Sequence, residues 1–155
     1  MKRIILFRAK RKDNGQWVYG TYQKIDNNIN IPFCRNIIVK HIICAYFPGD
    51  WNMGRWENVE IDIDTLCQLT GLQDIKEKDI YEGDIVSSGV DIGVVEFDCG
   101  VFGINWDYFS TKKHRSMVGT FGQRHNLRRM DDDIIDHITV IGNIYDHNDK
   151  LLNEI

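Results

Sequence analysis

The chain is poor in several features that would point to a particular class of protein. Its 155 residues include only two prolines, and no apolar run comes close to the roughly 20 residues that span a bilayer. The apolar start over residues 4–7 is shorter than the about 7–15 residues of a secretory signal. A net charge of −4 excludes a uniformly basic surface that would attract nucleic acid or anionic lipid. We therefore expect a cytoplasmic protein with no membrane partner.

Closely spaced metal ligands are absent as well. The cysteines Cys34, Cys44, Cys67 and Cys99 form no Cys-x-x-Cys pair, and the five histidines form no His-Glu-x-x-His motif. Metal sites usually show such spacing, and cytosolic proteins rarely keep disulfides. We predict reduced cysteines with a packing role, and we expect no cofactor.

The composition that is present is typical of a folded domain. Apolar residues make up 43% of the chain and charged residues 27%, as in soluble globular proteins. A chain of this length forms one domain, or a domain with an insertion. The hydrophobic pattern predicts a mainly β fold with minor helix. It divides into N-terminal hairpins (1–47), an exposed loop (48–58), a barrel-like unit (59–146) and a tail (147–155).

The N-terminal hairpins are predicted from turn signals. Asn14-Gly15 favours a type I′ turn, because both central residues of that turn need positive φ. Residues 17–22 then form a return strand rich in aromatic and β-branched side chains. A second turn at residues 26–28 is followed by strands over 29–33 and 36–47. The stretch 48–58 has a proline, two glycines and two tryptophans, which is typical of a loop.

Residues 60–70 allow two interpretations. Apolar and polar residues alternate from Ile61 to Leu69, which favours a strand. The alternative is a short helix that Asp64 would cap and Gly71 would end. We predict the strand.

The C-terminal half carries the clearer strand pattern. Strands are predicted from Asp84 to Ser87, over 92–97 and over 101–106, with a hairpin loop at Asp98-Cys99-Gly100 between the last two. Residues 138–145 supply a closing strand. This order of strands and turns is similar to that of a small Src-homology-type β-barrel.

Three motifs carry a resemblance to a known family. Thr70-Gly71-Leu72 is followed by Ile-Tyr-Glu-Gly-Asp-Ile-Val at 80–86. Near the N-terminus, Asn-Gly-Gln-Trp-Val-Tyr-Gly occupies 14–20, and the chain later closes with Ile-Gly-Asn-Ile-Tyr at 141–145. These motifs resemble those of the YopX-like family of phage and prophage proteins, which has no assigned activity. The resemblance implies a protein of a bacterial host cell in which the motif residues are structural: Thr70, Gly71, Leu72, Tyr81, Glu82, Gly83, Asp84, Gly142, Asn143 and Tyr145.

Two charged segments are candidates for chemistry or binding. Asp79, Glu82 and Asp84 could act as acid and base or hold a divalent cation, as in a metal-dependent hydrolase. The structural alternative, which we favour, is that Asp84 accepts backbone hydrogen bonds in the turn while Glu82 is solvated. The basic segment 112–129 could contact phosphates of a nucleic acid. Its cations are Lys112, Lys113, Arg115, Arg124, Arg128 and Arg129.

Three functions follow from these features. The first is a phage or prophage accessory protein that acts by binding a phage or host protein, as a homo-oligomer and without catalysis. Surplus aromatic residues and the acidic run at 131–136 beside the basic segment favour self-association. The second is a nucleic-acid-binding module, and the third is the hydrolase.

Overall fold

Antiparallel strands make up most of the part of the chain that the computed structural model describes, which is residues 4–26, 39–50, 53–98, 100–106, 108–109, 127–130 and 135–146. These residues belong to two units, 1–69 (unit 1) and 70–155 (unit 2), and we describe each by itself. No helix in these ranges has the length and apolar character to cross a membrane.

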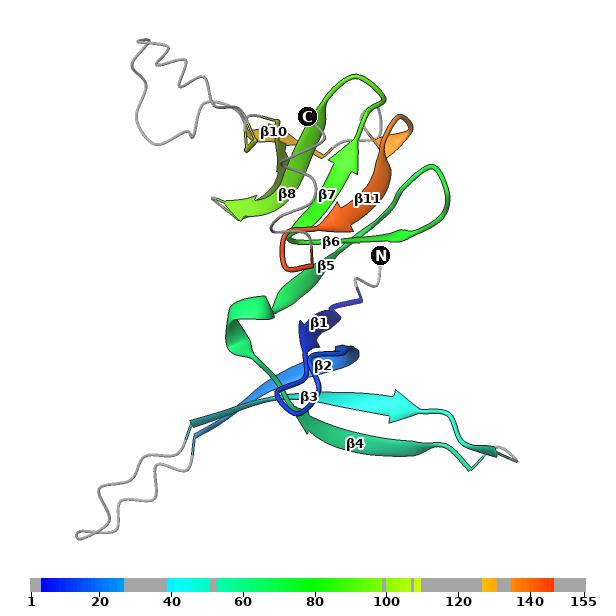
Figure 1. Cartoon of the computed structure of the whole chain (residues 1–155), viewed down its shortest axis with the longest axis vertical. Helices are drawn as coiled ribbons and strands as arrows, with labels where there is room; N and C mark the ends of the chain where they lie inside the picture. Colours follow the sequence, from blue (N-terminus) through cyan, green and yellow to red (C-terminus); the bar gives the residue numbers. More distant parts are fainter. Residues whose placement is uncertain are drawn as a thin grey trace, which may run out of the picture. The chain divides into compact units, whose positions relative to one another are not determined.

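Unit 1 is a sheet with the strand order β4-β3-β2-β1-β5. Its strands are β1 (Phe7–Lys10), β2 (Trp17–Asp26), β3 (Val39–Phe47) and β4 (Arg55–Glu60), followed by the first residues of β5 (Cys67–Gln73). The ribbon of β3 and β4 is visible in Figure 1. The later residues of β5 lie in unit 2, where β5 neighbours β6 (Asp79–Tyr81).

Strand β2 changes its pairing partner at Gly20. Residues before it pair with β1, whereas Thr21 and those after it pair with β3. A Cβ on Gly20 would lie 2.1 Å from the carbonyl oxygen of Cys44, so only glycine allows this approach. A further bridge joins Arg11 to Ile61 beyond the end of β4. The core of unit 1 consists of Ala9, Val18, Ile43, Ala45, Val59 and Ile61.

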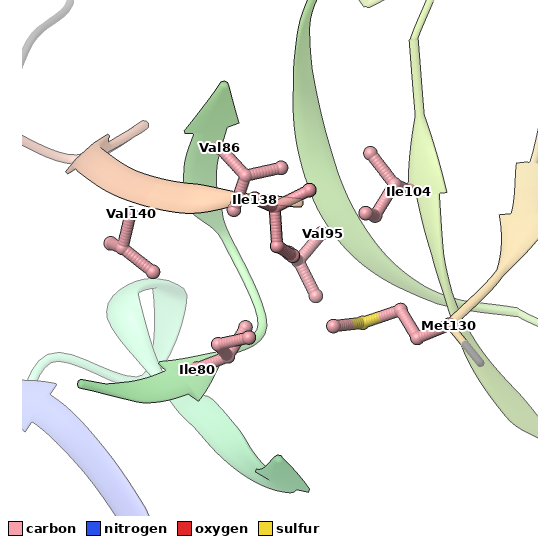
Figure 2. Packing of buried hydrophobic residues seen from close by; sticks show 7 residues of the cluster. All are labelled: Ile80, Val86, Val95, Ile104, Met130, Ile138 and Val140. Atoms are coloured by element: carbon pink, nitrogen blue, oxygen red, sulfur yellow. The ribbon is translucent and has the colours of Figure 1, made fainter. Parts of the chain in front are cut away.

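Unit 2 contains a second antiparallel sheet with the order β10-β9-β8-β7-β11. The strands are β7 (Asp84–Ser87), β8 (Ile92–Asp98), β9 (Val101–Asn105), β10 (Leu127–Arg129) and β11 (Thr139–Asn143). Figure 2 shows its core, to which most strands contribute a branched aliphatic side chain. The core residues are Ile80, Val86, Val95, Ile104, Met130, Ile138 and Val140.

The predicted mainly β fold is confirmed, as are the strands around 17–22, 84–87, 92–97 and 101–106. The predicted strand over 36–47 is confirmed from Val39 onward. The strand predicted over 29–33, the tail and most of the segment 110–136 lie outside the described residues. The described strands form no closed barrel, so the Src-homology-type barrel and the single-domain division stay predictions.

The strand predicted through residues 61–69 is wrong in its first half. A 3-10 turn, η2 (Ile63–Thr65), interrupts it, and the strand begins only at Cys67. The Asp62 side chain accepts a hydrogen bond from the Asp64 backbone, and the Thr65 hydroxyl donates to the Asp62 carbonyl. These local bonds compete with a strand ladder and override the alternating pattern. Asp62, rather than Asp64, is therefore the capping residue.

Two smaller predictions also differ from the structure. The loop predicted over 48–58 is shorter, because β4 begins at Arg55 and pairs with β3. The turn at Asn14-Gly15 is not type I′, since Gly15 alone of the two has positive φ. The Asn14 side chain instead accepts a hydrogen bond from the Gln16 backbone, and Arg11 and Gln16 close a longer loop.

Candidate functional site

The family-motif segments around residues 70–84 and 142–145 come together in unit 2. β7 and β11 pair so that Asn143 lies opposite Asp84, and the backbone N–H of Ile144 donates to the carbonyl of Gly83 at 3.0 Å. Gly83 has a φ of +76°, as its turn position predicts, and its own N–H donates to Val95 at 2.8 Å. The two motifs therefore form one structural junction.

The buried polar side chains of this junction bind backbone groups. Asp84 is 1% exposed, and its carboxylate accepts the N–H of Tyr81 at 2.8 Å. The buried Thr70 hydroxyl donates to the carbonyl of Ile80 at 2.8 Å. The Asn143 side-chain oxygen accepts the N–H of Tyr145 at 2.9 Å. Each of these polar groups satisfies a backbone partner within the fold, which is the use expected of buried polar groups.

A further buried carboxylate, Asp74, was not predicted. One of its oxygens accepts the N–H groups of Lys76 at 2.8 Å and Lys78 at 3.0 Å, and the other accepts the N–H of Val140 at 2.9 Å. Burial alone would raise the pKa of Asp74, but these three hydrogen bonds outweigh it and hold that pKa below its ordinary value. Asp74 thereby fastens the turn at 74–78 to β11.

The acidic trio does not form a metal site. Asp79 is exposed and accepts a hydrogen bond from the Gln73 side chain at 2.9 Å, whereas Asp84 is buried. No three His, Cys, Asp or Glu side chains of the described residues are placed to hold a metal ion. The hydrolase hypothesis based on Asp79, Glu82 and Asp84 therefore gains no support from the geometry.

The other predicted candidates are only partly described. Of the basic segment 112–129, only the backbone of residues 127–129 is described, as β10, and the remainder lies outside the described residues. Cys44 is half-buried, and the buried Cys67 thiol donates to the carbonyl of Thr65 at 3.3 Å. A packing role fits the buried Cys67. The other two cysteines fall outside the described part of the chain.

A surface hollow of about 370 Å³ in unit 1 is lined by paired charges. Arg11 and Asp13 form an ion pair at 2.6 Å, and Lys12 pairs with Glu60 at 2.9 Å. The hydrogen bond with Asp13 raises the pKa of Arg11 and lowers the pKa of Asp13, and the bond from Lys12 lowers the pKa of Glu60. These pKa shifts favour the charged forms of Arg11, Asp13 and Glu60, so none of these three groups is suited to accept or release a proton near neutral pH.

The face of β2, β3 and β4 that points away from the core of unit 1 carries an exposed aromatic pair. Tyr46 on β3 lies opposite Trp56 on β4, with ring centroids 5.4 Å apart and an interplanar angle of 57°. Tyr46 is 51% exposed and Trp56 is 70% exposed. We call this surface the outer face. The sequence pattern predicts a loop at residue 56 and does not single out Tyr46, because cross-strand register cannot be read from one sequence.

The described residues define an antiparallel β protein, and no three or more of their His, Cys, Asp and Glu side chains could hold a metal ion. The model of the YopX protein family matches residues 6–153, and the chain belongs to that family. The crystal structure of protein EF1440 from Enterococcus faecalis is similar to this chain at 21% identity. It has a TM-score of 0.48, and the match covers 97% of this chain and 99% of that one. Comparison with curated proteins gives no match.

We predict that Asp74→Asn destabilises the protein by about 1–3 kcal/mol, because an amide NH₂ would replace one of two buried acceptor oxygens and face a backbone N–H. Urea denaturation at neutral pH measures this difference. Asp79→Asn is the matched control, since it changes an exposed carboxylate in the same segment, and we expect only a small effect.

The same pair of proteins gives a pH prediction. The folded-state pKa of Asp74 is depressed, so its contribution to stability is present above the unfolded value of about 3.9 and is lost as pH falls through the folded value. The stability gap between the wild type and Asp74→Asn should therefore narrow below about pH 4. A gap that stays constant or widens on acidification would contradict this role.

A third prediction concerns Gly83. Gly83→Val should lower the melting temperature more than Gly83→Asn, although the two side chains have similar size. Positive φ costs about 1–2 kcal/mol for most side chains and less for asparagine, and it is least compatible with β-branching. Equal melting temperatures for the two variants in a thermal denaturation experiment would show that the backbone conformation is not what requires glycine.

Proposed function

We propose that this protein is a phage or prophage accessory protein that acts by binding a macromolecule through the outer face of unit 1, without catalysis. The observation that carries the proposal is the exposed pair of Tyr46 and Trp56. Large aromatic side chains dominate binding hot spots. The cross-strand contact between the two rings stabilises the pairing of β3 and β4, but it leaves about half or more of each side chain exposed. The phage or prophage origin rests on family membership and on what the family resemblance implies.

The distribution of polar groups in unit 2 agrees with this proposal. The buried side chains Asp74, Asp84 and Asn143 each accept backbone hydrogen bonds, so the junction built from the family motifs serves the architecture of the fold. The outer face, in contrast, exposes the aromatic rings of Tyr46 and Trp56. Binding is therefore assigned to unit 1, and the family motifs keep a structural role.

Site-specific photocrosslinking in bacterial cells tests the proposal. We expect Trp56→p-benzoylphenylalanine to give a discrete crosslinked species after irradiation. The same substitution at Phe97 is the control, because Phe97 is a comparably exposed aromatic residue (47%) in unit 2. Absence of a crosslink at position 56, or equal crosslinking at both positions, would refute binding by the outer face.

We also propose that copies of the chain self-associate. The net charge of −4 conceals an asymmetry between the two units. Residues 1–69 contain ten Lys and Arg against seven Asp and Glu, a net charge of +3, and residues 70–155 contain nine against sixteen, a net charge of −7. Opposite charges on different copies attract each other at low ionic strength.

Light scattering tests self-association directly. We expect a mass above 18.1 kDa at micromolar concentration in low salt, with a shift toward monomer as salt screens the attraction. A monomer at both low and moderate salt would contradict self-association and would leave the role of the outer face intact.

A further inference from the structure

The outer face of unit 1 combines stacking surfaces with polar and cationic side chains. In an antiparallel sheet, residues directly opposite each other share a face. The register places Thr21, Cys44 and Asn58 in one row and Gln23, Ile42 and Glu60 in the next. The pair of Tyr46 and Trp56 lies on the same face, next to the row that contains Cys44 and Asn58.

Polar side chains outnumber apolar ones in these two rows. Thr21, Gln23 and Asn58 are exposed and uncharged, whereas Ile42 is 4% exposed. Tyr and Trp are also enriched in the cores of protein–protein interfaces, but the fully buried core of such an interface is more apolar than these amides and hydroxyls. The same arrangement suits a ligand that presents flat rings bordered by hydrogen-bonding edges.

Lys40 and the positive net charge of unit 1 favour a ligand with an anionic backbone. Lys40 is exposed, lies opposite Ile25 of β2 on the outer face, and forms a long ion pair with Glu60 at 3.7 Å. An exposed ion pair of this kind is weak, so the ammonium group can exchange Glu60 for a phosphate. Residues 1–69 carry a net charge of +3 in a chain whose total is −4. Electrostatic attraction of an anionic ligand is therefore concentrated in unit 1.

We propose that the outer face binds single-stranded nucleic acid. Bases would stack on Tyr46 and Trp56, amides and hydroxyls would contact base edges, and Lys40 would neutralise a phosphate. Exposed aromatic rings on a sheet, combined with cations, form the usual platform for single strands, and its binding depends little on base sequence. The proposal rests on the proposed function, because it names the class of macromolecule that the outer face takes. It differs from the sequence-based hypothesis in using unit 1 rather than residues 112–129.

Fluorescence anisotropy with a labelled oligothymidylate tests the proposal. An oligonucleotide of about 20 nucleotides exceeds the ~4–16 nucleotides that one such platform covers. We expect binding in low salt, and we expect Trp56→Ala and Tyr46→Ala each to weaken it by about five- to a hundredfold, the usual effect of losing one stacking ring. Trp56→Phe should restore part of the affinity. Tyr108→Ala is the matched control, since Tyr108 is an exposed tyrosine (46%) of unit 2, and its affinity should stay unchanged.

Salt dependence supplies a second readout that a merely structural role would not change. Lys40→Gln should reduce the slope of log affinity against log salt by about 0.7, the contribution of one phosphate contact on a single strand. Melting temperatures close to that of the wild type would show that the variants are folded.

The failures are distinguishable. No binding to single-stranded DNA or RNA in low salt would overturn the proposal, as would equal affinity of the wild type, Trp56→Ala and Tyr46→Ala. A crosslink at position 56 that resists nuclease and is destroyed by protease would overturn it too, and would leave the proposed function standing with a protein partner. Loss of the crosslinked species on nuclease treatment would support both binding by the outer face and a nucleic acid as its ligand.

Discussion

The hydrogen bonds of the buried Asp74 carboxylate join the turn at 74–78 to β11, and the arrangement of unit 2 depends on them. A buried charge is unfavourable unless several donors satisfy it, and Asp74 has three backbone N–H groups as donors. Two of them belong to the turn at 74–78, and the third belongs to Val140, 66 residues away in the chain. The N–H of Ile75 also donates to the carbonyl of Ile138 at 3.2 Å. The turn therefore covers polar groups of the last strand of the sheet.

This contact explains how the family motifs are held in register. β11 pairs with β7 on one side and is bound by the turn on the other. An uncovered edge strand is open to pairing with other chains, and a β-bulge between Val140 and Gly142 together with the turn reduces that exposure. Gly83 and Asp84 can then meet Asn143 and Ile144 at one place. The junction therefore consists of the turn at Gly83 and the turn at 74–78, and the buried Asp74 carboxylate binds the second turn to β11.

Unit 1 shows the opposite distribution of features. Its core is apolar, and its charged hollow consists of surface ion pairs, which contribute little to stability in water. Its outer face exposes the aromatic rings of Tyr46 and Trp56. We therefore propose a division between an architectural junction in unit 2 and a binding surface in unit 1. Among the described residues, no group of three or more His, Cys, Asp or Glu side chains could hold a metal ion.

Much of the fold could be predicted because it depends on local signals. The strand after Gly83 and the hairpin at Gly100, whose φ is +84°, follow from turn residues and alternation. The alternating pattern concealed the turn at Ile63–Thr65, whose local bonds to Asp62 compete with a strand. A tertiary bond adds to them, because the hydroxyl of Thr65 also accepts the N–H of Lys10, 55 residues earlier in the chain. Asp74 carried a turn signal, but its bond to Val140 depends on tertiary structure. The pair of Tyr46 and Trp56 likewise depends on the register between β3 and β4, which alternation alone does not fix.

Chemical-shift mapping by NMR tests the central claim most directly, since it reports on both units in one experiment. Titration of the isotope-labelled protein with a short single-stranded oligonucleotide should shift the indole N–H of Trp56 and the backbone amides of Tyr46 and Asn58. The amides of Asp74, Asp84 and Asn143 should keep their positions. Shifts confined to these last three residues, with Trp56 unaffected, would contradict the assignment of binding to unit 1 and of architecture to unit 2.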